Sequence, residues 1–297
     1  MTTIGVFDSG FGGLTVLRAL IERMPQAQFA FLGDTARLPY GSKSRRTIAR
    51  YAVESAQFLV REQGAEFLVI ACNTASALAL DAIQDAVPVP VLGVIEPGAA
   101  AARAASSTGD VLVIATDATV HSHAYAAACR ALGLRALEKA CPLLVPLVEE
   151  GWIDFSTLSA AGTVPSAAQA ASAPPQVAVT SEVIDIYLNE LRVEAAQNGF
   201  DPDTLVLGCT HYPLLRPLFE KAVRPGAKVI DSAQAAAEAA VLLIGGRLAP
   251  PVAPLPLLPP SAQLRCFATD SVEKFERLGS RFLGQPVGHV QLVDLGG

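Results

Sequence analysis

The sequence predicts an α/β protein made of two pseudo-symmetric lobes, each built on a parallel sheet. Short apolar runs rich in β-branched residues alternate with segments whose apolar residues recur at helical spacing. Such alternation is typical of parallel sheets joined by right-handed crossovers. A faint internal repeat, residues 68–72 (LVIAC) and 205–209 (LVLGC), indicates that the two halves are related.

The chain up to Pro97 shows a regular succession of strands and helices. The continuous apolar run at residues 67–71 suits a strand that is buried on both faces. Gly64 is a good terminator for the helix before it. We expect strands at residues 2–7, 29–32, 67–71 and 91–94, and helices at residues 14–24, 48–59 and 75–86.

The pattern restarts after Pro97. We expect strands at residues 110–115, 204–207, 229–230, 264–267 and 287–293, and helices at residues 121–132, 142–150, 183–191, from 213, 235–243 and 272–282. Two segments look like insertions: the Ala/Ser/Pro-rich residues 157–176 and the Pro-rich residues 250–260, the second a stiff connector. The uncharged stretch 156–181 is predicted to be a loop rather than a membrane helix.

Composition and charge exclude several classes of protein. Apolar residues make up 51% of the chain and charged residues 17%, which is typical of a globular protein. The formal net charge is −6, so no nucleic-acid partner is expected. One basic cluster, predicted to be a solvated helix face, comprises Lys43, Arg45, Arg46 and Arg50. We expect no signal peptide and no membrane partner, since no apolar stretch is long enough to cross a bilayer.

The cysteine pattern indicates free thiols. The five cysteines are Cys72, Cys129, Cys141, Cys209 and Cys266, and none forms a C-x-x-C pair. An odd number of widely spread cysteines without a secretion signal indicates reduced thiols in the cytoplasm, and no structural zinc is expected. His121 and His123 are expected to be exposed residues at a helix start rather than metal ligands.

Two loops have the composition of binding segments. Residues 8–13 (DSGFGG) lie between a strand and a helix, where glycines allow close approach of a ligand and helix N–H groups attract an anion. The alternative is a tight turn in which Asp8 or Ser9 caps the helix. In residues 33–41, Asp34 and Arg37 are expected to form a surface ion pair, while Tyr40 and Gly41 could supply a hydroxyl or a backbone N–H to a substrate.

Cys72 and Cys209 both lie one or two residues beyond a predicted strand, where open α/β sheets bind ligands. Moving a proton from one face of a carbon to the other needs a base on one side and an acid on the other. Two cysteines can do this if one is a thiolate and one a thiol, and helices that begin after each would favour the thiolate. The alternative is that both are ordinary core residues, because cysteine is common in cores.

Other polar residues of the same motifs complete the predicted site. Asp8 and His211 are the nearest candidates, by motif position, to orient or relay protons beside the thiols. The groups expected to bind an α-carboxylate as charge develops on it are those of Ser9, Asn73, Thr74 and Thr210. No lysine lies in a context that suggests a Schiff base, so no cofactor is expected.

Six ordered motifs extend along nearly the whole chain. They are residues 5–16 (GVFDSGFGGLTV), 33–35 with 39–41 (GDT and PYG), 72–76 (CNTAS), 93–97 (GVIEP), 141–149 (CPLLVPLVE) and 207–213 (LGCTHYP). In this order they resemble the motifs of the glutamate racemases, within the aspartate/glutamate racemase superfamily. The main departure is the stretch 157–176, which looks longer than usual and bears on lobe packing and oligomer geometry.

The resemblance implies a fold and a mechanism. Its active site lies in the cleft between two α/β lobes, and we expect residues 1–95 with 232–297 to form the first and residues 96–231 the second. Each lobe gives one catalytic cysteine: Cys72 would deprotonate the D-isomer of glutamate and Cys209 the L-isomer, with no cofactor. The residues implied to hold the substrate are Asp8, Ser9, Tyr40, Gly41, Asn73, Thr74, Thr210 and His211.

The resemblance also implies a cellular role and leaves alternatives. Glu149 matches a family carboxylate near the second cysteine. D-glutamate would feed peptidoglycan and so the cell wall and cell shape, from a cytoplasmic homodimer. Aspartate racemases tend to carry His and Glu where this chain has Ser76 and His211, which favours glutamate. Aspartate or hydantoin racemase remains open, as do a catalytically idle amino-acid-binding regulatory protein, which would need neither cysteine, and a redox or metal protein.

Overall fold

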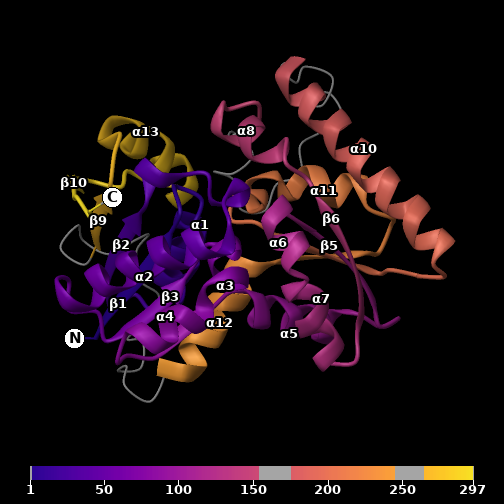
Figure 1. Cartoon of the computed structure of the whole chain (residues 1–297). Helices are drawn as coiled ribbons and strands as arrows, with labels where there is room; N and C mark the ends of the chain where they lie inside the picture. The colour runs from indigo at the N-terminus through magenta and orange to yellow at the C-terminus, as the bar shows by residue number, and fades with distance from the viewer. Residues whose placement is uncertain (1, 154–174, 245–263, 297) are drawn as a thin grey trace.

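Two parallel sheets organise the molecule (Figure 1). The computed structural model describes residues 2–153, 175–244 and 264–296. Within these residues, a six-stranded sheet has the order β10-β9-β2-β1-β3-β4 and a four-stranded sheet has the order β6-β5-β7-β8. Every strand pair in them is parallel. The predicted α/β fold with parallel sheets is therefore confirmed.

The ten described strands divide between the two sheets. The first sheet contains β1 (Thr3–Asp8), β2 (Gln28–Gly33), β3 (Phe67–Ile70), β4 (Val91–Gly93), β9 (Leu264–Ala268) and β10 (Val290–Leu292). The second contains β5 (Asp110–Ala115), β6 (Arg135–Ala140), β7 (Thr204–Gly208) and β8 (Lys228–Asp231).

Helices connect and cover these strands. Those around the first sheet are α1 (Leu14–Arg23), α2 (Arg45–Arg61), α3 (Asn73–Leu78), α4 (Leu80–Ala86), α12 (Ser232–Ile244) and α13 (Val272–Leu283). Those around the second are α5 (Ile95–Ala105), α6 (Asp117–Ser122), α7 (Ala124–Ala131), α8 (Leu144–Glu149), α10 (Pro175–Gln197) and α11 (Arg216–Ala222). Short 3-10 turns are η1 (Thr35–Arg37), η2 (Tyr40–Ser42) and η4 (Tyr212–Leu215).

Strand β1 is the centre of the first sheet. It lies between β2 and β3, with Val6 opposite both Phe31 and Val69. Ile4 and Val6 face a core that includes α1, whereas Phe7 faces a core that includes α2. Burial on both faces explains why the central strands are continuous apolar runs rather than alternating ones.

The C-terminal segment returns to the first sheet. Figure 1 shows β9, β10 and α13 beside the N-terminal strands, and β9 pairs with β2. The strands β5 to β8 fall within residues 96–231 and all other strands fall outside that range. The lobe boundaries themselves stay a prediction.

Two elements were missed by the sequence patterns. Helix α5 begins at Ile95, ahead of Pro97, where a new succession of strands and helices was expected to start. A proline is tolerated there because a residue in the first turn of a helix loses no hydrogen bond. Strand β6 has the charged sequence RALEKA and pairs only with β5, so it is an edge strand without the apolar signature of the central ones.

Two of the predicted helices are each divided into two shorter helices. The helix expected at residues 75–86 is divided at Ala79, whose dihedral angles are not helical. The helix expected at 121–132 is divided at His123, which has a left-handed conformation (φ 53°). His121 therefore lies near the end of α6 instead of at a helix start, although both histidines are exposed as expected.

The predicted loop at residues 156–181 is only partly tested. Its last residues are helical, because α10 begins at Pro175, and a proline is well suited to a first helical turn. The predicted insertion 157–176 lies outside the described residues except for its last two, and the predicted connector 250–260 lies wholly outside them.

Replacement of Phe275 tests how α13 packs against the first sheet. Its ring is fully buried, 5.7 Å from the Phe11 ring and 5.9 Å from the Phe31 ring between centroids. Because truncation leaves a cavity, Phe275→Ala should lower the free energy of unfolding by about 3–5 kcal/mol in urea denaturation. Ile186→Ala, at a side chain that is 57% exposed, is the control and should change it by less than about 0.5 kcal/mol. Equal effects of the two variants would contradict this packing.

Candidate active site

The carboxyl ends of the central strands in both sheets meet at one cavity of about 350 Å³. Strand β1 ends at Asp8, β3 is followed by Ala71 and Cys72, and β7 is followed by Cys209. All the sequence-predicted site residues except Asp8 line this cavity. Those from the first sheet are Ser9, Tyr40, Gly41, Cys72, Asn73 and Thr74. Those from the second are Glu149, Cys209, Thr210 and His211.

Cys72 is held in the neutral form by its surroundings. It caps the N-terminus of α3, where its Sγ accepts the Ala75 N–H at 3.4 Å. The Ser9 hydroxyl lies 3.3 Å from the same sulfur. The pKa of Cys72 is raised to about 12, first by burial and next by the charge of Asp8, while the contacts with Ser9 and Ala75 lower it. Cys72 is therefore a thiol at neutral pH, and it lies at the cavity wall.

Cys209 has a different set of neighbours. His211 Nδ1 lies 4.0 Å from Cys209 Sγ, and His211 Nε2 lies 3.2 Å from Glu149 Oε1. Burial lowers the pKa of His211, but the hydrogen bonds to Cys209 and Glu149 outweigh it and raise this pKa to about 10. Burial likewise raises the pKa of Glu149, but the bond to His211 and the charge of Lys274 outweigh it and hold it below its usual range. His211 is thus a cation between a sulfur and a carboxylate.

Asp8 lies behind the cavity wall. It is buried, and its Oδ2 accepts the Gly10 N–H at 2.9 Å, while its Oδ1 has no hydrogen-bond partner among the described residues. Burial raises the pKa of Asp8, against the attraction of His211. The structure therefore places Asp8 where its charge acts on Cys72 and His211, although Asp8 itself does not line the cavity.

The predicted surface ion pair is buried. Arg37 Nε lies 2.8 Å from Asp34 Oδ2, and the Asp34 side chain is fully enclosed. The Tyr40 hydroxyl donates to the same carboxylate at 2.5 Å, and burial raises the pKa of Tyr40 far above its usual value. The hydroxyl proton of Tyr40 is therefore already used within the protein, while both Tyr40 and Gly41 line the cavity.

Several neighbours of the predicted residues were not identified from the sequence. Thr74 Oγ1 lies 2.9 Å from Thr116 Oγ1 and 3.3 Å from Thr119 Oγ1, which links the two lobes beside the cavity. The Tyr125 hydroxyl donates to Asn73 Oδ1 at 2.7 Å and fixes that amide. Thr116 directly follows β5, so the rule that strand ends bind ligands could have found it. Nothing in the pattern around Tyr125 indicates its role.

The glycine loop after β1 is explained by lobe contact. A Cβ atom on Gly12 would lie 2.2 Å from Thr210 Oγ1 and 2.6 Å from His211 Nδ1, so only glycine fits there. The Thr15 hydroxyl donates to the Thr210 carbonyl at 3.1 Å across the same contact. The loop therefore packs closely against the second-lobe residues Thr210 and His211 and holds them at the cavity. This contact explains the glycine at position 12, which an anion site or a simple helix cap would not require.

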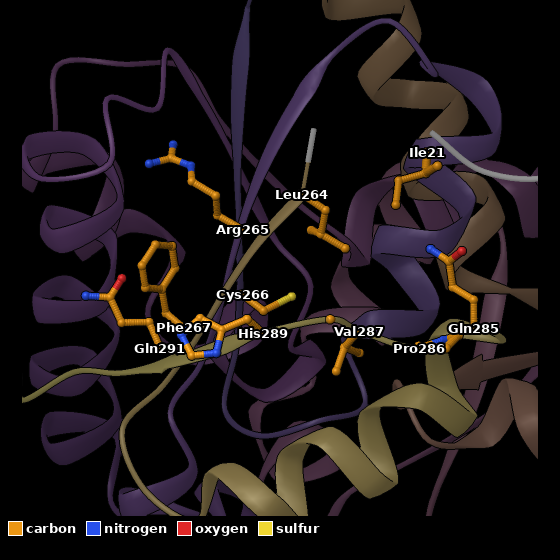
Figure 2. A pocket seen from close by; sticks show the side chains of 11 residues that line it. Ile21, Leu264, Arg265, Cys266, Phe267, Gln285, Pro286, Val287, His289 and Gln291 are labelled. Atoms are coloured by element: carbon orange, nitrogen blue, oxygen red, sulfur yellow. The ribbon is translucent and has the colours of Figure 1, made fainter. Parts of the chain in front are cut away.

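A second hollow, of about 400 Å³, lies beside β9 and β10 (Figure 2). Figure 2 shows Leu264 and Cys266 pointing to one side of β9, and Arg265 and Phe267 to the other. Burial alone raises the pKa of Cys266 to about 12, and no base or donor within the described chain contacts its sulfur. This thiol is a core residue, and the hollow lacks paired reactive groups.

Neither a metal-binding cluster nor a membrane-spanning helix is found among the described residues. In residues 2–153, 175–244 and 264–296, no three His, Cys, Asp or Glu side chains are placed to hold a metal ion. No helix among those residues is both long and apolar enough to span a bilayer.

Comparison with known proteins assigns the family. The model for Asp/Glu/Hydantoin racemase matches residues 4–240. The glutamate racemase of Koribacter versatilis (strain Ellin345) is 50% identical, over 99% of this chain and 98% of that protein. Among solved structures, glutamate racemase RacE1 from Bacillus anthracis is 33% identical with a TM-score of 0.81, over 99% of this chain and 98% of that one. The Francisella tularensis enzyme, solved with D-glutamate, is 31% identical with a TM-score of 0.78, over 99% and 98%. The chain therefore belongs to the Asp/Glu/hydantoin racemase family.

Proposed function

We propose that this protein is a glutamate racemase that interconverts L-glutamate and D-glutamate by a two-base mechanism without a cofactor. The observation that carries the proposal is that two cysteines, each following a central strand of a different sheet, line one cavity. The names of the matched relatives support glutamate as the substrate.

The two thiols would act in opposite protonation states. From L to D, the Cys209 thiolate takes the α-proton, and the electron pair of the broken C–H bond is delocalised into the α-carboxylate. The Cys72 thiol then gives its proton to the opposite face of the carbon and becomes the thiolate. The reverse reaction begins from that state, with Cys72 as the base. No proton or electron is gained or lost overall.

His211 and Glu149 favour Cys209 as the base for the L-isomer. A protonated His211 can donate toward the sulfur from Nδ1 while its Nε2 donates to Glu149. The positive charge of His211 would thus lie beside the Cys209 sulfur whenever that sulfur is a thiolate. Asp8, which does not line the cavity, would act through the effect of its charge on Cys72 and His211 rather than by contact with the substrate.

The α-carboxylate would be bound by neutral donors. The side chains of Ser9, Asn73, Thr74 and Thr210 all reach the cavity. Donors fixed in advance stabilise the charge that develops as the proton leaves, and their effect is larger in a closed site than in water. The Tyr125 and Thr116 contacts hold Asn73 and Thr74 in place for this purpose.

The choice of glutamate over aspartate rests on His211. Ser76 and His211 are the two positions at which aspartate racemases tend to differ, and of these only His211 lines the cavity. The Ser76 hydroxyl donates to the Ile70 carbonyl and accepts the Val94 N–H, so its role is structural. The proposal extends to a cytoplasmic homodimer that supplies D-glutamate for peptidoglycan, and aspartate and hydantoin racemases are the alternatives to be tested.

Replacement of either cavity thiol tests the two-base assignment. Cys72→Ala and Cys209→Ala should each lower the rate of racemisation by about 10³-fold or more, because one of the two proton transfers loses its group. Chiral chromatography of the product measures this, and circular dichroism should show an intact fold. Cys129→Ala, at a buried thiol of α7 away from the cavity, is the control and should keep its activity. Substantial turnover by either cavity variant would refute the assignment.

Solvent exchange tests the reaction and the substrate. Incubation of the protein with L-glutamate in D2O, with no added cofactor, should give D-glutamate that carries deuterium at the α-carbon, because the second thiol equilibrates with solvent. Proton NMR follows the loss of the α-hydrogen. Aspartate and a hydantoin, run in parallel, should not exchange at a comparable rate. Exchange with one of these and none with glutamate would replace the proposed substrate.

The charge on His211 should make stability depend on pH. Its folded pKa of about 10 exceeds the unfolded value of about 6.5. The stabilisation is therefore complete below pH about 6.5 and is lost as the pH rises toward about 10. The parent should lose stability relative to His211→Asn between pH 7 and 10, at no more than about 1.4 kcal/mol per pH unit in urea denaturation. A difference that stays constant across this range would contradict a charged His211.

A further inference from the structure

We propose that Lys274 is a positioning residue for the reaction: it reaches from α13 to Glu149 across the cleft and holds that carboxylate on His211. The inference rests on the proposed racemase function. Lys274 lies outside residues 4–240, the part of the chain that the family model matches.

The contact chain runs from the first lobe to the second thiol. Lys274 Nζ lies 3.4 Å from Glu149 Oε2, while the other oxygen, Oε1, lies 3.2 Å from His211 Nε2. His211 Nδ1 in turn lies 4.0 Å from Cys209 Sγ. Because the two cations use different oxygens, they fix the plane of the Glu149 carboxylate as well as its position.

Packing of the neighbouring residue anchors helix α13, and with it the backbone of Lys274, on the first sheet. The neighbouring Phe275 is buried against Phe11 and Phe31, which fixes the helix on the first sheet. Lys274 Nζ also lies 5.4 Å from the centroid of the Phe11 ring, a favourable position for a cation over an aromatic face.

The same helix touches His211 directly. Phe282, about two turns after Lys274, packs edge-on against the imidazole with ring centroids 5.0 Å apart. Helix α13 therefore contacts both members of the His211–Glu149 pair. Figure 1 shows α13 and α8 at the same end of the molecule, and the contact between Lys274 and Glu149 joins them across the two lobes.

The Lys274–Glu149 ion pair is expected to affect the rate of proton transfer more than the stability of the fold. The Lys274 side chain is 42% exposed and that of Glu149 18%, so the ion pair is partly hydrated and contributes little to folding. Proton transfer is far more sensitive, since a misplacement of about 1 Å can cost roughly 100-fold in rate. A small loss of order at Glu149 would thus be visible in catalysis and not in stability.

The charged groups that face Glu149 are few. They are His211 and Lys274, with Asp8 acting on the same region from behind the wall. Loss of the lysine charge leaves the carboxylate with one cationic partner, so its pKa should rise.

The test compares three variants. Lys274→Met removes the charge, Lys274→Arg keeps it, and Arg277→Met removes a charge from the same helix at an exposed side chain with no ion pair in the described chain. Carbon-13 NMR titration of Glu149, without substrate, should show a higher carboxyl pKa in Lys274→Met and parent-like values in the other two. An unchanged Glu149 pKa in Lys274→Met would overturn the proposal.

Kinetic measurements then distinguish a specific effect on proton transfer at Cys209 from a non-specific loss of activity. Lys274→Met should lower kcat by roughly 10-fold, with rescue by Lys274→Arg and no loss in Arg277→Met. Its primary isotope effect on kcat/KM should grow with α-deuterated L-glutamate and not with the D-isomer, because only Cys209 takes the proton from L. Equal changes with both isomers would refute the inference. A parent protein that does not racemise glutamate would refute the proposed function instead, and the NMR titration alone would then decide the Lys274 contact.

Discussion

The close contact between the loop after β1 and the turn after β7 is the constraint on which the candidate site depends. Position 12 can hold only glycine, since a Cβ atom there would lie 2.2 Å from Thr210 Oγ1. That contact brings the carboxyl ends of two different sheets to one cavity. Parallel sheets place their reactive loops at these ends, so joining two of them end to end gives groups on both sides of a ligand.

The two thiols differ in what surrounds them. Cys72 has neutral donors, the Ser9 hydroxyl and the Ala75 N–H, whereas Cys209 has a histidine that is paired with a carboxylate. In a two-base mechanism each sulfur must be stable in both forms, because every turnover exchanges their roles. In the proposed scheme the neutral groups around Cys72 would stabilise the thiolate formed after conversion of L to D, and the His211 charge would stabilise the thiolate formed at Cys209 after the reverse conversion.

Much of this could be predicted from the sequence, for identifiable reasons. Buried parallel strands are continuous apolar runs, so β1, β3, β5 and β7 were readily found, and residues just beyond them were natural candidates. Strand β6 and helix α5 were missed because an edge strand may be charged and a proline is tolerated in a first turn.

Contacts between distant segments could not be predicted. The Tyr125 bond to Asn73 and the approach of Lys274 to Glu149 join residues that are 52 and 125 positions apart, so no local spacing indicates them. The Asp34–Arg37 pair is local, but its burial also depends on tertiary packing. Asp8 illustrates the same limit: it was expected to hold the substrate, but it does not line the cavity, and its carboxylate accepts the Gly10 N–H.

The central claim is that two sulfurs stand on opposite faces of one substrate carbon. A crystal structure of the protein with bound glutamate measures this most directly. The account predicts that the Sγ atoms of Cys72 and Cys209 lie on opposite sides of Cα, each at roughly 3–4 Å. Both sulfurs on one side of the carbon, or either one out of reach of it, would contradict the account.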